Sequence, residues 1–183
     1  MLAALAVRPW DGTCPGCGVV LPPNEGPRHA YLGASAECWQ LYGRLASPSS
    51  TAPDALRLRR LIADAYAAQH PGVPQLRSVQ SIAVHLMDLC LLLERGGAGP
   101  RAAPEPGERP RRKALDLHWL EPPETRGVMT AADALRTGGA ESRAVRVEAW
   151  ATEVWSAWEA HHPTVRAWVD ACAPVLAQPG RAG

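Results

Sequence analysis

The chain lacks an excess of charge of either sign. Its 183 residues include 19 lysine and arginine residues and 18 aspartate and glutamate residues, and the formal net charge is +1. A nucleic-acid backbone or an anionic membrane attracts a basic surface, so this balance makes nucleic acid an unlikely partner. Phenylalanine is absent and Lys113 is the only lysine. This bias is typical of a GC-rich genome and excludes no mechanism.

The chain also lacks a long uncharged apolar run. The longest candidate, residues 82–93, contains His85 and Asp88, and a membrane-spanning helix needs about 20 apolar residues. The apolar start, Met1 to Val7, has no preceding positive charges and no convincing cleavage site. We therefore expect a cytoplasmic protein that does not associate with a membrane.

Common enzyme signatures are missing as well. The sequence contains no glycine-rich phosphate loop, no nucleophile elbow and no His-Glu-x-x-His helix.

Its five cysteines are an odd number, and three of them lie in the first 38 residues. Such crowding favours a metal site over a disulfide framework, and leaves Cys90 and Cys172 as predicted core thiols.

The crowded cysteines have the spacing of a zinc site. In Cys14-Pro15-Gly16-Cys17-Gly18, a tight turn can direct two thiolates at one ion. His29 and Cys38 follow at spacings that would complete a tetrahedral Cys3His set. We predict a structural Zn²⁺ bound by Cys14, Cys17, His29 and Cys38, which would stabilise a segment with little apolar burial. The alternative is a redox or adventitious cysteine pair, with His29 on the surface.

The remainder of the chain has mainly helical periodicity. Apolar residues recur at helical spacing over residues 54–69, which predicts a first helix. A second predicted helix follows Ser78, a possible N-cap, and two more lie on either side of His161-His162-Pro163. Thr130 and Asp133 predict a short capped helix. We predict a mainly α fold: an irregular bundle of about five helices in a domain over residues 54–178. A zinc-knuckle-like segment (residues 1–45) packs on it, and residues 96–112 form a flexible loop.

A second polar group lies within these helices. His85 and Asp88 interrupt the apolar run, and Asp64 and His70 come from the neighbouring predicted helix. Asp64, His70 and His85 are candidate catalytic residues, because such a group can hold a metal or perform acid–base chemistry, with Asp88 orienting His85. Alternatively, Asp64 pairs with Arg60, His85 is bonded within the core and His70 caps a helix.

Several longer motifs resemble an uncharacterised bacterial family, a domain of unknown function. They are the Cys-Pro-x-Cys-Gly motif, Gly26-Pro27-Arg28-His29, Gln69-His70-Pro71-Gly72, His85-Leu86, Trp119-Leu120-Glu121-Pro122-Pro123 and Trp155-Ser156-Ala157-Trp158. The resemblance covers nearly the whole chain and implies one architectural unit, without a known substrate or reaction. Family members often have histidine where this chain has Arg59, which alters any metal site that uses this position.

Three functions are consistent with these features. The first is a zinc-binding protein of unknown specific role, whose helical surface or pocket recognises a protein or a small molecule. The second is a small metal-dependent enzyme with an inter-helical His/Asp site. The third is a regulatory or nucleic-acid-associated zinc protein. Homodimerisation through exposed tryptophan-bearing faces is also possible.

Overall fold

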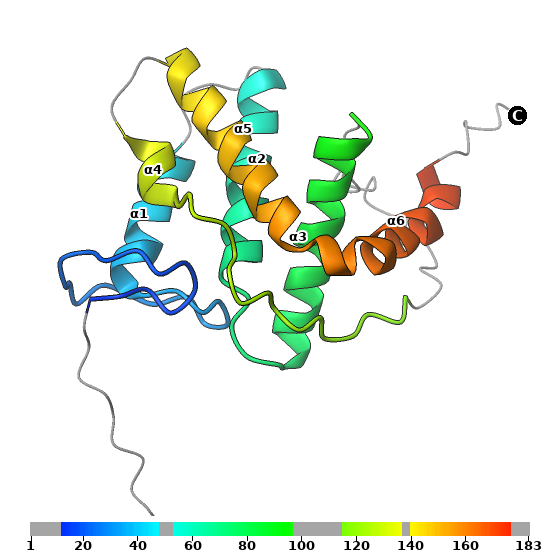
Figure 1. The fold of residues 1–183 in the computed structure, drawn as a ribbon, viewed down its shortest axis with the longest axis horizontal. Helices are drawn as coiled ribbons and strands as arrows, with labels where there is room; N and C mark the ends of the chain where they lie inside the picture. The colour runs from blue at the N-terminus through cyan, green and yellow to red at the C-terminus, as the bar shows by residue number, and fades with distance from the viewer. Residues whose placement is uncertain (1–11, 48–52, 97–114, 137–139, 177–183) are drawn as a thin grey trace, which may run out of the picture.

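The computed structural model describes residues 12–47, 53–96, 115–136 and 140–176. These residues form six α-helices and one 3-10 turn, shown in Figure 1. The elements are α1 (Ala36–Ala46), α2 (Pro53–Gln69), α3 (Leu76–Glu94), α4 (Ala131–Leu135), α5 (Ala140–Ala157), η1 (Glu159–His161) and α6 (His162–Leu176). No strand occurs within these ranges, so the predicted mainly α fold is confirmed. The loop predicted at 96–112 lies, from residue 97 onward, outside the described residues.

Helix α2 is the centre of the bundle. It packs against α3 on one side and α5 on the other, and α6 packs on α3 (Figure 1). Leu61, Ile62 and Ala65 of α2 are fully buried or nearly so, as their helical spacing predicted. Four buried tryptophans complete the core, namely Trp150, Trp155, Trp158 and Trp168. The predicted dimer through exposed tryptophan faces stays a prediction, but these four side chains do not supply such faces.

Helix α3 is long and apolar enough to cross a membrane by length and composition. Within the described chain it instead packs against α2, α5 and α6, and it contains the fully buried carboxylate of Asp88. The core helix of a globular fold meets the same criterion, because burial on several sides requires apolar residues around the helix. Its packing therefore explains its composition.

Two helix starts differ from the sequence prediction. Residues 36–46 form α1, although the helical domain was predicted to start at residue 54, and the Ser35 hydroxyl caps α1 by accepting a hydrogen bond from Cys38 N at 3.2 Å. Helix α3 begins at Leu76, so Ser78 lies inside it rather than at its cap. The Ser78 hydroxyl donates to the Tyr31 carbonyl at 3.3 Å, and it thereby ties α3 to the N-terminal segment.

The C-terminal turn of α2 attaches two irregular segments to the bundle. The side-chain amide of Gln69 donates to the carbonyls of Arg126 and Met129, and its oxygen accepts from Trp150 Nε1. Immediately after it, the His70 carbonyl accepts a hydrogen bond from Gly33 N at 3.1 Å. The segments before α1 and before α4 therefore meet at the end of α2 (Figure 1).

Substitution of Gly43 tests whether residues 36–46 form helix α1. It is exposed inside α1, and a Cβ atom there would meet nothing within 4 Å. We expect Gly43→Ala to raise the free energy of unfolding by about 1 kcal/mol, because alanine loses less backbone entropy in a helix. Chemical denaturation measures this. Gly72→Ala is expected to lower the stability of the protein, because Gly72 has φ +74° and its added Cβ would collide with the Tyr31 carbonyl. A Gly43→Ala protein that is less stable than the unmodified chain would contradict the helical conformation of α1 at Gly43.

Candidate metal centre

A tight loop presents the first two cysteines. Cys14 N donates to the Val19 carbonyl at 2.8 Å, and Gly18 N donates to the Cys14 carbonyl at 2.9 Å. Gly18 takes φ +75°, a left-handed conformation that favours glycine. The loop therefore turns back on itself between Cys14 and Cys17, as the Cys-Pro-x-Cys-Gly motif predicted.

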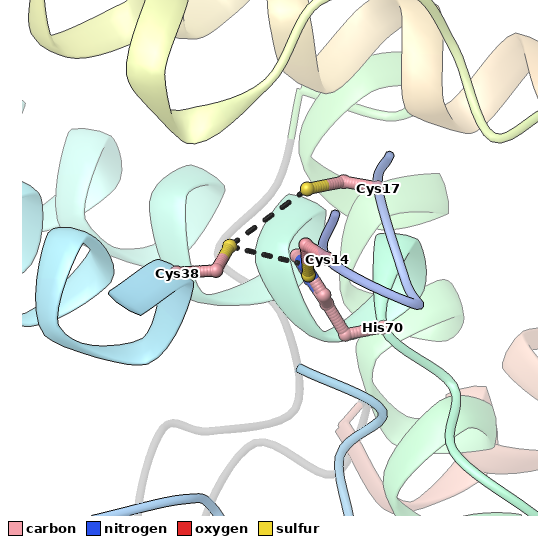
Figure 2. A group of neighbouring side chains, drawn as sticks. All are labelled: Cys14, Cys17, Cys38 and His70. Atoms are coloured by element: carbon pink, nitrogen blue, oxygen red, sulfur yellow. Dashed lines mark hydrogen bonds between the residues drawn. The ribbon is translucent and has the colours of Figure 1, made fainter. Parts of the chain in front are cut away.

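Two helices bring the other donors to this loop. Cys38 projects from the first turns of α1, and His70 directly follows α2, so that Cys14, Cys17, Cys38 and His70 face one another (Figure 2). Their ligand atoms all lie within 4.8 Å of one another. Cys14, Cys38 and His70 are at most 1% exposed. Three thiols and one imidazole thus form a compact buried cluster.

Two distances within the cluster match those of a tetrahedral metal site. Zn–S bonds of about 2.3 Å and Zn–N bonds of about 2.0–2.1 Å place two sulfurs about 3.8 Å apart and a sulfur and a nitrogen about 3.5 Å apart. Cys17 Sγ lies 3.7 Å from Cys38 Sγ, and Cys38 Sγ lies 3.4 Å from His70 Nε2. A disulfide needs about 2.05 Å between sulfurs, and all the cysteines are free.

Hydrogen bonds around the cluster orient its donors. His70 Nδ1 lies 2.7 Å from the Tyr66 carbonyl, to which it can only donate, so Nε2 keeps its lone pair for an ion. The Tyr66 ring stacks on His70 at 4.1 Å between centroids. Ser35 N donates to Cys14 Sγ at 3.5 Å, the type of backbone contact that stabilises a thiolate. The histidine tautomer required for metal binding is therefore already set.

The cluster concentrates negative charge when its thiols ionise. Hydrogen bonds from Cys17 and Cys38 lower the pKa of the Cys14 thiol well below its ordinary value. The same contacts with Cys14 raise the pKa of Cys17 to about 12 and also raise the pKa of Cys38. One thiolate therefore opposes ionisation of the other two. A divalent cation would remove this conflict, because it stabilises all three thiolates together.

Arg126 supplies a positive charge beside the cluster. Its guanidinium donates to the Gly16 carbonyl at 2.6 Å. Burial lowers the pKa of Arg126, and the charges of Cys17 and Cys14 act in the opposite direction. Because a Cys3His site with a divalent ion has a net charge of −1, this contact compensates part of that charge.

The structure brings together three of the four predicted zinc ligands. His29 is not part of the cluster: its Nδ1 accepts from Leu32 N at 3.3 Å, and its ring packs edge-on against Trp39 at 4.6 Å. The fourth donor is His70, which the sequence suggested only as a catalytic or helix-capping residue. The spacing along the chain favoured His29, which is nearer to the cysteines in sequence, whereas the fold places His70, at the end of α2, beside them.

The other catalytic candidates form a separate pair. His85 Nδ1 lies 2.7 Å from Asp64 Oδ1, and the carboxylate is fully buried. Asp64 therefore orients His85, and the expected Asp88 does not. Arg60 lies 3.6 Å from Asp88 rather than pairing with Asp64. The three predicted catalytic residues are thus divided between the cysteine cluster and a His–Asp pair.

Sequence reasoning also missed Gly16, Tyr66 and Arg126 as residues that support the cluster. Only Gly16 had a local signal, since it lies between the two cysteines. A Cβ atom at Gly16 would collide with the His70 ring and lie 2.7 Å from the Gly33 carbonyl oxygen. The loop can therefore approach His70 only with glycine at this position.

Substitution of Gly16 tests this packing. Gly16→Ala is expected to displace His70 and to lower the affinity for a divalent metal by about tenfold or more, the size of effect typical of residues that orient ligands. Competition with a chromophoric chelator measures the affinity. Gly43→Ala, which touches nothing near the cluster, is the matched control, and equal affinities of the two variants would contradict the expected collision.

Comparisons with known proteins place the chain in a family. No curated protein and no solved structure shows significant similarity to it. Residues 12–159 match the family described as "Family of unknown function (DUF5946)", and this range contains all four residues of the cluster as well as Asp64 and His85. The match covers most of the 183 residues. The chain belongs to this family of unknown function.

Proposed function

We propose that the protein binds one Zn²⁺ ion through Cys14, Cys17, Cys38 and His70 and that this ion is structural. The observation that carries the proposal is the agreement of the Cys17–Cys38 and Cys38–His70 distances with the edges of a zinc-centred tetrahedron. Three soft thiolates and one imidazole favour zinc over magnesium, calcium or manganese, which prefer oxygen ligands.

A structural role follows from how the site is closed. Four protein donors complete a tetrahedron and leave no position for water or substrate, unlike catalytic zinc sites, which keep one position open. The cluster also joins the two regions predicted from the sequence, because its cysteines lie before residue 45 and His70 follows α2. Zinc would therefore hold the irregular segment 12–35 against the helical bundle and contribute directly to folding.

The enzymatic alternative loses one of its residues in this arrangement. His70 belongs to the cysteine cluster, and among the described residues that cluster is the one group of three or more potential metal ligands. His85 and Asp64 alone supply too few ligands for a second metal site of the usual kind. We propose a small molecule as the partner, since an aromatic cavity lies beside the site. The near-neutral charge gives no support to nucleic acid.

Metal stoichiometry tests the zinc proposal. We expect elemental analysis and native mass spectrometry to find one zinc per chain, and Cys38→Ser and His70→Ala to lose it because each removes a donor. His29→Ala is the matched control, since it removes the histidine that spacing alone selected, and it is expected to keep its zinc.

Two further measurements remain informative if the ligand variants fail to fold. Cobalt substitution of the unmodified chain is expected to give the intense visible bands of a tetrahedral site together with thiolate charge-transfer absorption. Zinc at 1,000 times its Kd is expected to stabilise the chain against unfolding by about 4 kcal/mol. A chain without zinc, an octahedral cobalt spectrum or zinc loss in His29→Ala alone would refute the proposed ligand set.

A further inference from the structure

Tyr66, whose ring stacks on His70, also lines a cavity next to the cysteine cluster. This cavity of about 230 Å³ opens between the segment before α1 and helices α1, α2 and α3. Its lining includes His29, Trp39, Tyr42, Tyr66 and His85. A dry cavity of about 150 Å³ accommodates benzene, so this one can hold a compact ring compound of about ten non-hydrogen atoms.

His85 presents a proton acceptor to this cavity. Its Nδ1 lies 2.7 Å from Oδ1 of Asp64, whose carboxylate is fully buried, whereas the His85 side chain is 15% exposed. The carboxylate holds the proton on Nδ1, so the lone pair of Nε2 is on the ring edge away from Asp64. A buried carboxylate also stabilises the imidazolium that forms when Nε2 accepts a proton. This pair therefore has the arrangement of a base and its orienting carboxylate.

His29 presents the opposite hydrogen-bonding character. Its Nδ1 accepts a hydrogen bond from Leu32 N at 3.3 Å, so the neutral ring carries its proton on Nε2. Burial, and secondarily the proximity of His85, lower the pKa of His29, which keeps the ring neutral. Within the described chain, no residue hydrogen-bonds to Nε2 of either histidine. The cavity thus combines one acceptor with one donor.

Aromatic rings form much of the wall. Trp39 stacks on Tyr42 at 5.0 Å, and Tyr42 stacks on Tyr66 at 4.4 Å between centroids. Because Tyr66 also stacks on His70, the faces of Tyr42 and Tyr66 are covered, and these two rings offer their edges to the cavity. Ring edges pair favourably with the face of a flat aromatic ligand. No lysine or arginine of the described chain lines the cavity, so a ligand with a permanent negative charge would have no fixed countercharge. The ligand that matches is uncharged in solution and can give up a proton on binding.

We propose that this cavity binds a compact aromatic molecule with a weakly acidic hydroxyl group, such as a phenol or a hydroxylated heterocycle, and that His85 accepts its proton. The O–H bond of the ligand breaks and an N–H bond forms at Nε2 of His85, without transfer of electrons to or from the protein. The resulting oxyanion accepts hydrogen bonds from His85 and from His29 Nε2, and Asp64 balances the imidazolium charge.

4-Nitrophenol is a suitable probe, because it has about ten non-hydrogen atoms, as the cavity requires, and its phenolate absorbs visible light. The full zinc-loaded chain is titrated at a pH where the free probe is mostly protonated. We expect a saturable rise in phenolate absorbance. The methyl ether of the probe, 4-nitroanisole, has no proton to transfer and is expected to bind at least about tenfold more weakly.

Two variants assign the signal to the His–Asp pair. His85→Phe is expected to lower the saturable phenolate signal at least about tenfold, and Asp64→Asn to weaken it by a similar factor because the balancing charge is lost. His118→Gln is the control: this histidine is exposed and contacts Trp168, away from the cavity, and its variant is expected to keep the full signal. Retained zinc in each variant shows that its fold is intact.

Specific results would overturn the proposal. These are the absence of a saturable signal in the unmodified chain, an unchanged signal in His85→Phe, equal binding of nitroanisole, or a second zinc equivalent that His85→Phe removes. If the variants fail to fold, the comparison of nitrophenol with nitroanisole on the unmodified chain still decides. A full signal in a chain that contains no zinc would refute the structural zinc site and leave this cavity assignment standing.

Discussion

The hydrogen bond from His70 Nδ1 to the Tyr66 carbonyl fixes the end of α2, where the segments before α1 and before α4 attach to the bundle. It holds the imidazole along the last turn of α2, with Nε2 toward the cysteines. From the same turn, Gln69 binds the segment before α4, and the His70 carbonyl accepts Gly33 N from the segment before α1. Three connections therefore meet at this turn, and the orientation of the His70 ring determines the one to the cysteines.

The N-terminal region depends on this turn because it has little hydrophobic surface of its own. Residues 12–35 contain one isolated bridge, Thr13 with Val20, and no helix. Beside a few apolar contacts, such as those of Leu21 and Leu32 with the core, it makes polar contacts, such as Asn24 N to Glu37 at 2.7 Å and Ser35 N to Cys14 Sγ at 3.5 Å. Polar contacts of this kind add little net stability in water, so a metal–thiolate centre is a fitting replacement for apolar burial.

Much of the helical bundle could be predicted from the sequence, because apolar spacing and the Thr130 cap are local signals. The start of α3 was misplaced, since Ser78 is bonded to a distant carbonyl rather than to its own helix. The grouping of Cys14, Cys17 and Cys38 was also predictable, but the histidine beside them was not: His29 and His70 are equally good ligands chemically, and only tertiary packing brings His70 to the cysteines. A pocket was expected, but its full lining could not be predicted, because the walls of the cavity come from four separate segments.

The donor set spans 21 residues from Cys17 to Cys38 and a further 32 from Cys38 to His70. In a classical zinc finger, all four donors lie in one short peptide, which can hold the ion before any tertiary structure exists. Here an unfolded chain offers only the Cys14–Cys17 pair at short range, so we expect it to bind a metal ion weakly. Binding of the proposed ion would then stabilise the native state relative to the denatured ensemble. Metal binding at the proposed site would thus require completed tertiary structure, because a peptide that ends before His70 lacks one of the four donors.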